Sequence, residues 1–340
     1  MATSGASTRD AAELAANEVN ARGGLLVGKV RYRIIPDYGD IADATDVATA
    51  AAQVLLTRPE IVAIVGPQFS RAALPVANLA ENAHVPMITP MGSHPAITAG
   101  RQWVFRIAFT DDFQAGVLAR WARGNMHASR AAILVEESAA YSRDIATRFD
   151  SVFTALGGRV VAREGYTRDQ RGDFADALRR VRATNPDVLL LPNELHDDTL
   201  QMRQARDVGI TASFVLPDFV DSRVMGTVPA AQGLYTTHQW HTQAPGAASR
   251  TFLTLFDSVY HRVPSVTSAS TYDAFRLLFD AMQRAGSTNP DSLRTAIAAT
   301  RDFPGVTGTI SYHGRQDPVK PAFLLRLDQS HLTIIKVVTP

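Results

Sequence analysis

The segment formed by residues 61–98 constrains the fold more than any other part of the chain. Apolar runs alternate in it with small polar turns, in the order strand, turn, helix, strand, turn. Parallel strands joined through a helix build an open α/β sheet, and ligands bind such sheets at the carboxyl ends of the strands. The turns at residues 66–70 and 90–95 are therefore the expected places for a bound molecule.

Composition narrows the classes of function. The 340 residues are 46% hydrophobic, which is enough for two domains of ordinary size. Lys and Arg total 34, Asp and Glu total 33, and the two signs are interspersed, so we expect neither nucleic acid nor an anionic membrane as partner. The absence of cysteine excludes thiol nucleophiles, thiolate metal sites and disulfides.

The first part of the chain alternates helices with short strands. Helical spacing of Ala and Leu predicts a helix over residues 9–20, which ends at Gly23 and Gly24, and another over 45–56. Apolar runs predict strands at 31–36, 61–65 and 87–89. This rhythm indicates parallel pairing with helices on the faces of the sheet.

A second α/β region begins after residue 108. Its predicted strands, at residues 131–136, 159–165, 188–191 and 213–216, alternate with helices. Three long helices follow with few strands between them, and we expect them to pack on the first sheet. The tail, residues 322–338, predicts a β-hairpin. Two similar α/β lobes with a ligand cleft between them are the predicted architecture.

Several segments in combination resemble the type I periplasmic solute-binding proteins of ABC transporters, of the leucine/isoleucine/valine-binding class. They include AELAANEVNARGG, VGPQFS, VPMITPMGSHPAIT, VFRIAFTDDFQAG, PDVLLLPNELHDD and GVTGTISYHGRQDP. The resemblance implies two Rossmann-like lobes, joined by a multi-strand hinge, that close over an amino acid. Lobe I would comprise residues 1–110 and 240–313, and lobe II residues 111–239 and 314–340.

The resemblance also implies which residues hold the ligand carboxylate. It places Ser70, Gly92 and Ser93 in that role. Turns that lead into helix N-termini present unpaired N–H groups and a positive dipole end to an anion. Ser70 is in addition a candidate N-cap of the helix that follows it.

The other lobe supplies the remaining contacts that the resemblance implies. Tyr141 reaches the ligand, and Asp218 binds its ammonium group, since a cation in a desolvated cleft needs a fixed counter-charge. Asn193 and Glu194 lie in a turn that lines the cleft in relatives. The family often has an aromatic residue nearby, whereas this chain has LPNELHDD, so the side-chain pocket and the identity of the amino acid stay open.

Each of these positions has a structural alternative. Asp218 can cap a turn at a strand end, Ser70 and Ser93 can act as caps alone, and Tyr141 can be an exposed aromatic residue before a helix. The run of Glu194 with Asp197 and Asp198 is typical of a solvated helix N-terminus, where the dipole stabilises acids.

Two other patterns carry little chemistry. Residues 23–29, GGLLVGK, have the spacing of a phosphate-binding loop, but Val30 replaces the required Ser or Thr, so we interpret them as a helix stop and a hairpin turn. His238 and His241 have no evident third metal ligand nearby. We expect no metal and no cofactor.

The predicted function is solute binding without catalysis. The protein is expected to be monomeric, periplasmic or otherwise extracytoplasmic, and to deliver an amino acid to an ABC permease. The alternative is a sensory or regulatory domain of the same fold for a small amide or carboxylate. An enzyme is disfavoured because no nucleophile and base pair is recognisable by motif.

The beginning of the chain departs from the implied family pattern. Relatives have a strand and a Gly-rich turn before the first helix, whereas the predicted helix here begins close to Met1. MATSGASTRD also lacks the basic and then apolar pattern of a signal peptide. We therefore expect the first strand and the signal peptide to be missing through trimming or a misplaced start, with some loss of stability.

Overall fold

The chain divides into two compact units. The computed structural model describes residues 4–41, 44–193, 195–218, 220 and 222–340. Unit 1 comprises residues 1–110, 239–321 and 339–340, and unit 2 comprises residues 111–238 and 322–338. Residues 239, 314–321 and 339–340, which the sequence prediction assigned to lobe II, fall in unit 1. For residues 314–321, Asp317 and Lys320 account for this, since they bond there to Arg106 and Thr307.

Unit 1 is built on a three-stranded parallel sheet of order β3-β4-β5. The strands are β3 (Ile64–Val65), β4 (Met87–Thr89) and β5 (Val104–Arg106). All residues of β4 and β5 are buried. Helices α2 (Thr45–Leu56) and α3 (Ser70–Ala83) pack on each other and contribute alanines to the core around Met87 and Val104.

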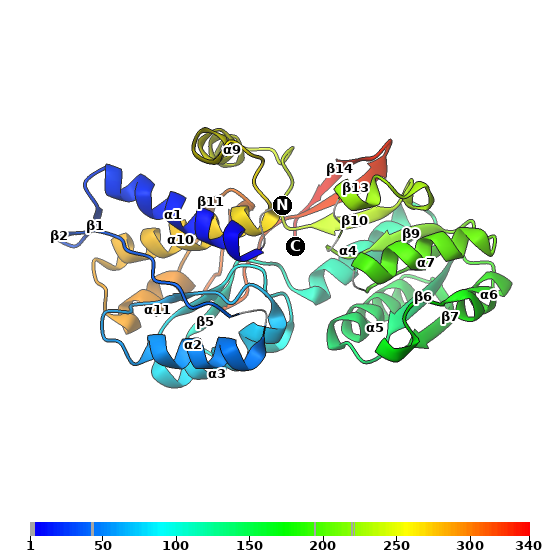
Figure 1. Ribbon diagram of the computed structural model, residues 1–340, viewed down its shortest axis with the longest axis horizontal. Helices are drawn as coiled ribbons and strands as arrows, with labels where there is room; N and C mark the ends of the chain where they lie inside the picture. The colour runs from blue at the N-terminus through cyan, green and yellow to red at the C-terminus, as the bar shows by residue number, and fades with distance from the viewer. Residues whose placement is uncertain (1–3, 42–43, 194, 219, 221) are drawn as a thin grey trace. The chain divides into compact units, whose positions relative to one another are not determined.

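The remaining helices of unit 1 include those from the later part of the chain. Helix α1 (Ser4–Ala21) packs along α10 (Val266–Ala285), and α11 (Pro290–Ala298) packs against α10 (Figure 1). Helix α9 (Ala247–Tyr260) and the hairpin of β11 (Phe303–Gly305) and β12 (Gly308–Ile310) complete the unit. Helix α10 also contacts β3, which places the late helices with the first sheet as the sequence predicts.

Unit 2 contains a seven-stranded mixed sheet of order β14-β13-β10-β9-β8-β6-β7. The parallel strands are β6 (Arg130–Glu136), β7 (Arg159–Tyr166), β8 (Val188–Leu190), β9 (Ser213–Leu216) and β10 (Tyr235–His238). The predicted C-terminal hairpin is present as β13 (Ala322–Asp328) and β14 (His331–Val338), which pair antiparallel at one edge.

Helices cover both faces of this sheet (Figure 1). They are α4 (Asp111–Gly124), α5 (Ala140–Ala155), α6 (Ala175–Ala183) and α7 (Leu195–Asp207), with the short α8 (Ser222–Met225) near β14. Alternate residues of β6, such as Ile133 and Val135, pack with Phe149 and Phe153 of α5 in one core. The alternation follows from the period of two along a strand.

The segment after α1 differs from its predicted structure. The sequence predicts a strand over residues 31–36, but the structure has a hairpin of β1 (Leu25–Val27) and β2 (Val30–Tyr32) with its turn at Gly28 and Lys29. The side chain of Asn20 accepts from the Ile34 N–H and donates to the Ile34 carbonyl, both at 2.8 Å. The Asn20 side chain thus satisfies the N–H and carbonyl of Ile34, which a neighbouring strand would otherwise pair.

Candidate ligand-binding site

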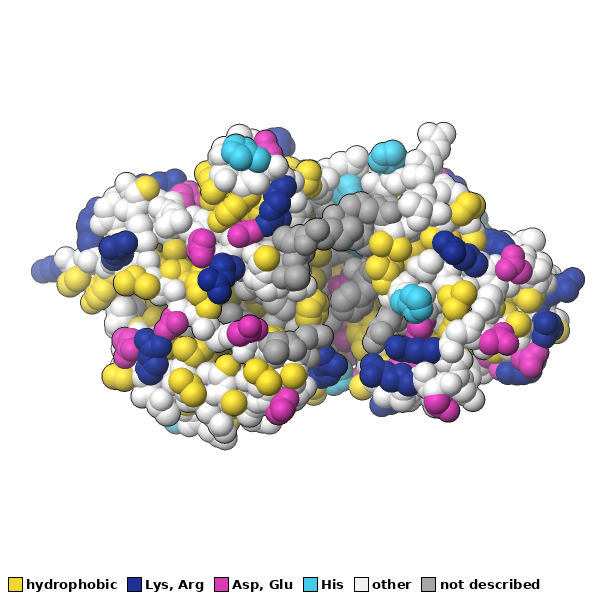
Figure 2. Space-filling view, in the orientation of Figure 1, with side chains coloured by type: hydrophobic (Ala, Val, Ile, Leu, Met, Phe, Trp, Pro, Cys, Tyr) yellow, Lys and Arg dark blue, Asp and Glu magenta, His cyan; other side chains and the backbone are white. Residues whose placement is uncertain are grey.

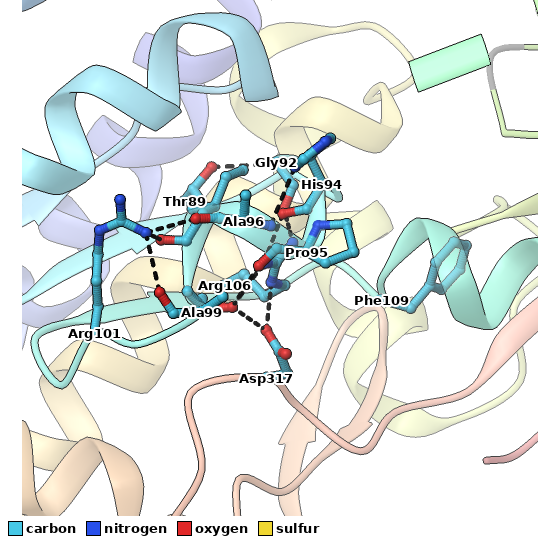
Figure 3. Close-up of polar contacts among 12 residues, drawn as sticks. Thr89, Gly92, His94, Pro95, Ala96, Ala99, Arg101, Arg106, Phe109 and Asp317 are labelled. Atoms are coloured by element: carbon cyan, nitrogen blue, oxygen red, sulfur yellow. Dashed lines mark hydrogen bonds and ion pairs between the residues drawn. The ribbon is translucent and has the colours of Figure 1, made fainter. Parts of the chain in front are cut away.

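The turn after β4 in unit 1 is held in shape by its own hydrogen bonds (Figure 3). Thr89, the last residue of β4, accepts from the Gly92 N–H at 3.1 Å and donates its hydroxyl to the Pro67 carbonyl at 2.7 Å. A Cβ atom at Gly92 would lie 2.7 Å from Thr89 Oγ1 and 2.8 Å from Ile97 Cδ1. Only glycine allows this close approach.

Ser70 connects this turn to the turn after β3. Its hydroxyl oxygen accepts from the His94 N–H at 3.2 Å. Ser70 is the first residue of α3, and the N-cap position belongs to Phe69, so the prediction that Ser70 caps the helix is wrong. With its oxygen accepting one bond, the hydroxyl keeps its proton for donation to a ligand.

The turn also carries donors that the protein does not use. Within the described part of the chain, neither the N–H of Met91 nor the N–H and hydroxyl of Ser93 forms a hydrogen bond. Ser93 is buried, with 5% of its surface exposed. The Gly92 N–H is already bonded to Thr89, so Gly92 shapes the turn. The N–H groups of Met91 and Ser93 are the ones available to bind a ligand.

Gly92→Ala is expected to weaken ligand binding about tenfold and to destabilise the protein by about 1–3 kcal/mol, because the added Cβ overpacks the turn and displaces it from Thr89. Calorimetric titration and thermal unfolding measure the two effects. Gly124→Ala is the matched control, since a Cβ at this helix end meets nothing within 4 Å. Equal behaviour of the two variants would contradict the role given to Gly92.

In unit 2, the structure brings together Tyr141 and Asp218, which lie 77 positions apart in the chain. The Tyr141 hydroxyl donates to Asp218 Oδ1 at 3.1 Å, and the Asp218 N–H donates to Gln114 Oε1 at 3.2 Å. Tyr141 lies in the first turn of α5 and Asp218 follows β9, so both stand at the carboxyl ends of parallel strands. This is the edge at which an α/β sheet binds ligands.

The environment of Tyr141 keeps its phenol protonated. Burial, followed by the negative charges of Asp218 and Asp111, raises the pKa of Tyr141 well above its ordinary value. The hydroxyl therefore remains a donor and fixes one carboxylate oxygen of Asp218.

Tyr141→Phe is expected to weaken ligand binding about tenfold, because Asp218 loses the donor that orients it while its charge remains. The ring packs against the core around Phe149, which phenylalanine preserves, so the melting temperature should change little. Titration beside a thermal melt checks this. An unchanged affinity would show that the hydroxyl plays no part in binding.

Asn193 has its amide group engaged inside unit 2. Its Oδ1 accepts from the Glu136 N–H at 2.9 Å, and its Nδ2 donates to the Leu134 carbonyl at 2.9 Å and to Gln201 Oε1 at 3.0 Å. These bonds favour a structural role, in which Asn193 connects β6 to the turn after β8. Glu194, the other residue predicted in this turn, lies outside the described residues.

The acids at the start of α7 are buried, which corrects the expectation of a solvated face. Asp197 is 1% exposed and Asp198 is 3% exposed. Asp197 accepts from the Tyr166 hydroxyl at 2.9 Å and forms an ion pair with Arg171 at 2.9 Å. The cause is tertiary pairing, since both partners come from outside this helix.

The described residues meet neither the requirements of a metal site of three or more ligands nor those of a membrane-spanning helix. In them, no group of three or more His, Cys, Asp or Glu side chains is arranged to hold a metal ion. No helix among those described has the length and apolar character needed to cross a bilayer. Positive and negative side chains are interspersed over the face shown in Figure 2, as the balanced composition predicts.

The family of the chain follows from comparison with known proteins. The family model described as "Periplasmic binding protein" matches residues 1–331. The chain belongs to the periplasmic binding protein family. Proteins of this family bind solutes and are not enzymes.

Several periplasmic binding proteins align with nearly all of this chain. Leu/Ile/Val-binding protein BraC3 of Rhizobium johnstonii is 26% identical over 333 residues, covering 96% of this chain and 87% of that protein. The leucine binding protein LivK of Thermotoga maritima is 26% identical with a TM-score of 0.85, covering 98% of this chain and 95% of that structure. LivJ of Streptococcus pneumoniae, solved in complex with isoleucine, is 25% identical with a TM-score of 0.85, covering 99% and 95%. The fold is thus the two-lobe α/β fold of type I periplasmic binding proteins.

Proposed function

We propose that this protein captures an α-amino acid, branched-chain or related, outside the cytoplasm and delivers it to an ABC permease. The observation that carries the proposal is the Tyr141–Asp218 pair. A carboxylate held by a phenol at the carboxyl end of a parallel sheet provides the counter-charge that an ammonium group requires in a desolvated site. Similarity to proteins named for leucine, isoleucine and valine binding supports the ligand class.

We assign the carboxylate of the amino acid to unit 1. The N–H groups of Met91 and Ser93, with the hydroxyls of Ser70 and Ser93, form a set of donors suited to a carboxylate. Donors placed at strand ends ahead of a helix favour negative charge.

Binding by two units gives the mechanism. We assign the two units to the two lobes that the resemblance implies. A zwitterion that contacts both lobes stabilises the closed arrangement by the free energy of the contacts made only there. The permease then recognises the closed, monomeric protein. A ligand with only one of the two charges satisfies one lobe and is expected to favour closure less.

A thermal-shift screen against the twenty amino acids and a set of small carboxylates tests this proposal. The protein is first unfolded and refolded to remove any ligand retained through purification. A ligand present at about a hundred times its Kd stabilises the folded state by about 2.7 kcal/mol, which gives a shift of several degrees. We expect such a shift from one or more branched-chain amino acids. A screen in which no amino acid raises the melting temperature would refute the proposal, and a response to carboxylates alone would show that the ligand class is wrong.

A further inference from the structure

We infer that Arg106 is a positioning residue that orients the Ser93 N–H for a ligand carboxylate through the carbonyl of Gly92. The identity of the bound group rests on the proposed function. The orientation of the turn rests on the structure of unit 1 alone.

Arg106 lies beneath the turn and is fully buried, with 0% of its surface exposed. It is the last residue of β5 and stands beside Thr89, the last residue of β4, in the parallel register. Its guanidinium donates through Nη1 to the Gly92 carbonyl at 2.8 Å and through Nη2 to the His94 carbonyl at 2.9 Å (Figure 3). A buried charge of this kind is costly unless it is fully paired, so its partners are held firmly.

The planarity of the peptide unit transmits this constraint to the donor side of the turn. In a trans peptide the carbonyl oxygen of one residue and the N–H of the next point in opposite directions. The Gly92 carbonyl points at Arg106, so the Ser93 N–H points away from the guanidinium. That N–H is one of the donors without a partner among the described residues. Arg106 therefore fixes its direction without touching the ligand.

A second charge locks Arg106 in place. Asp317 Oδ1 accepts from Arg106 Nε at 2.6 Å and from the Thr98 hydroxyl at 2.7 Å, and Thr98 Oγ1 accepts in turn from Arg106 Nη2 at 2.8 Å. Arg106, Thr98 and Asp317 are thus joined in a closed ring of hydrogen bonds. The Asp317 side chain is 44% exposed, so an asparagine there stays solvated, while the buried Arg106 loses its counter-charge.

Arg101 offers a matched control, because it bonds to residues that follow the same turn. It also donates to carbonyl groups there, to Ala96 at 2.5 Å and Ile97 at 3.0 Å, and to Asn78 Oδ1 at 2.6 Å. None of these carbonyls belongs to the peptide unit that carries the Ser93 N–H. Arg101→Lys thus weakens bonds to these residues without acting on that peptide unit.

The first test needs no ligand. Amide spectra of ¹⁵N-labelled full-length protein are compared for wild type, Arg106→Lys, Asp317→Asn and Arg101→Lys. Lysine keeps the positive charge but lacks the planar fork that holds two carbonyls and a carboxylate together. We expect the Ser93 resonance to shift or broaden in the Arg106 and Asp317 variants, with unit 2 resonances unchanged, and to stay in place in Arg101→Lys. A Ser93 resonance unaffected by both Arg106→Lys and Asp317→Asn would overturn the inference.

The second test compares L-leucine with L-leucinamide, which lacks the carboxylate. If Arg106 acts through the carboxylate donors, Asp317→Asn and Arg106→Lys weaken leucine binding about tenfold and leucinamide binding far less. A merely structural role would lower the melting temperature and weaken both ligands by the same factor, which would contradict the inference. Failure of wild type to bind leucine would count against the proposed function, while the amide spectra would still decide the role of Arg106.

Discussion

Replacement of Asp218 by Asn is expected to reduce the affinity for an α-amino acid by about a hundredfold or more. The side chain keeps its size, and Tyr141 can still donate to the remaining carbonyl oxygen, so the geometry is preserved. What is lost is the charge that offsets the desolvated ammonium group. Removing one partner of such a pair leaves the other unpaired, which is the costly situation. Calorimetric titration of both proteins with leucine measures the loss.

The control for this variant separates the effect of the charge at position 218 from the effect of the protein's net charge. Asp176→Asn makes the same substitution on an exposed side chain of α6, 86% accessible, and should leave the affinity unchanged. A deaminated analogue, 4-methylpentanoate, should bind Asp218→Asn no more weakly than it binds wild type. Wild-type affinity for leucine in Asp218→Asn would remove that acid from the site.

The second large effect is expected on stability, at Asp273 of α10. This fully buried carboxylate accepts from the Val306 N–H at 2.6 Å, the Thr307 N–H at 2.8 Å and the Thr307 hydroxyl at 2.7 Å, and Lys320 Nζ donates to Thr307 Oγ1 at 2.8 Å. Asp273→Asn replaces one acceptor oxygen by an NH₂ group that faces donors, and it removes the nearby counter-charge of Lys320. We expect a loss of about 3–5 kcal/mol in the free energy of unfolding.

Urea unfolding at pH 7 measures this loss. Asp280→Asn is the control on the same helix, because Asp280 pairs with Arg284 at the surface, where such pairs contribute about 0–1 kcal/mol. Similar losses from both substitutions would show that the buried network contributes no more than a surface pair.

Lys320 adds a dependence on pH whose sign is fixed by its burial. Burial lowers the pKa of Lys320 to about 8 from its ordinary 10.5. Between these pH values the unfolded chain binds more protons than the folded one, so this group makes stability rise with pH, by up to about 3 kcal/mol. Urea midpoints at pH 7.5 and 9.5 should therefore rise more in wild type than in Lys320→Met. Identical slopes for the two proteins would mean that Lys320 titrates normally.

Much of the fold could be predicted because periodicity and local signals agree with the tertiary structure. The helix predicted over 45–56 has those bounds in α2, and the strand at 213–216 has them in β9. The strand predicted at 31–36 is present only as far as Tyr32, in β2, and beyond it the Asn20 side chain pairs with the backbone of Ile34. The short hairpin of β11 and β12 was not predicted, since its three-residue strands carry no clear alternation.

The residues of the candidate site could also be predicted only in part. The resemblance to the solute-binding family selected Tyr141 and Asp218, which the structure joins by a hydrogen bond, although their roles remain predictions. Met91 was missed because its contribution is a backbone N–H, which any residue except proline provides. Arg106 was missed because one charged residue in a strand does not reveal that it will be buried beneath a turn.

The proposed function requires that the protein recognise both charges of an amino acid, one with each unit. One calorimetric series tests it directly: L-leucine, 4-methylpentanoate without the ammonium group, and 3-methylbutylamine without the carboxylate, each titrated into refolded wild-type protein. Leucine is expected to bind at least about a hundredfold more tightly than either analogue. Binding of 4-methylpentanoate as tight as that of leucine would contradict the proposed function, because the Tyr141–Asp218 pair would then have no ammonium group to hold.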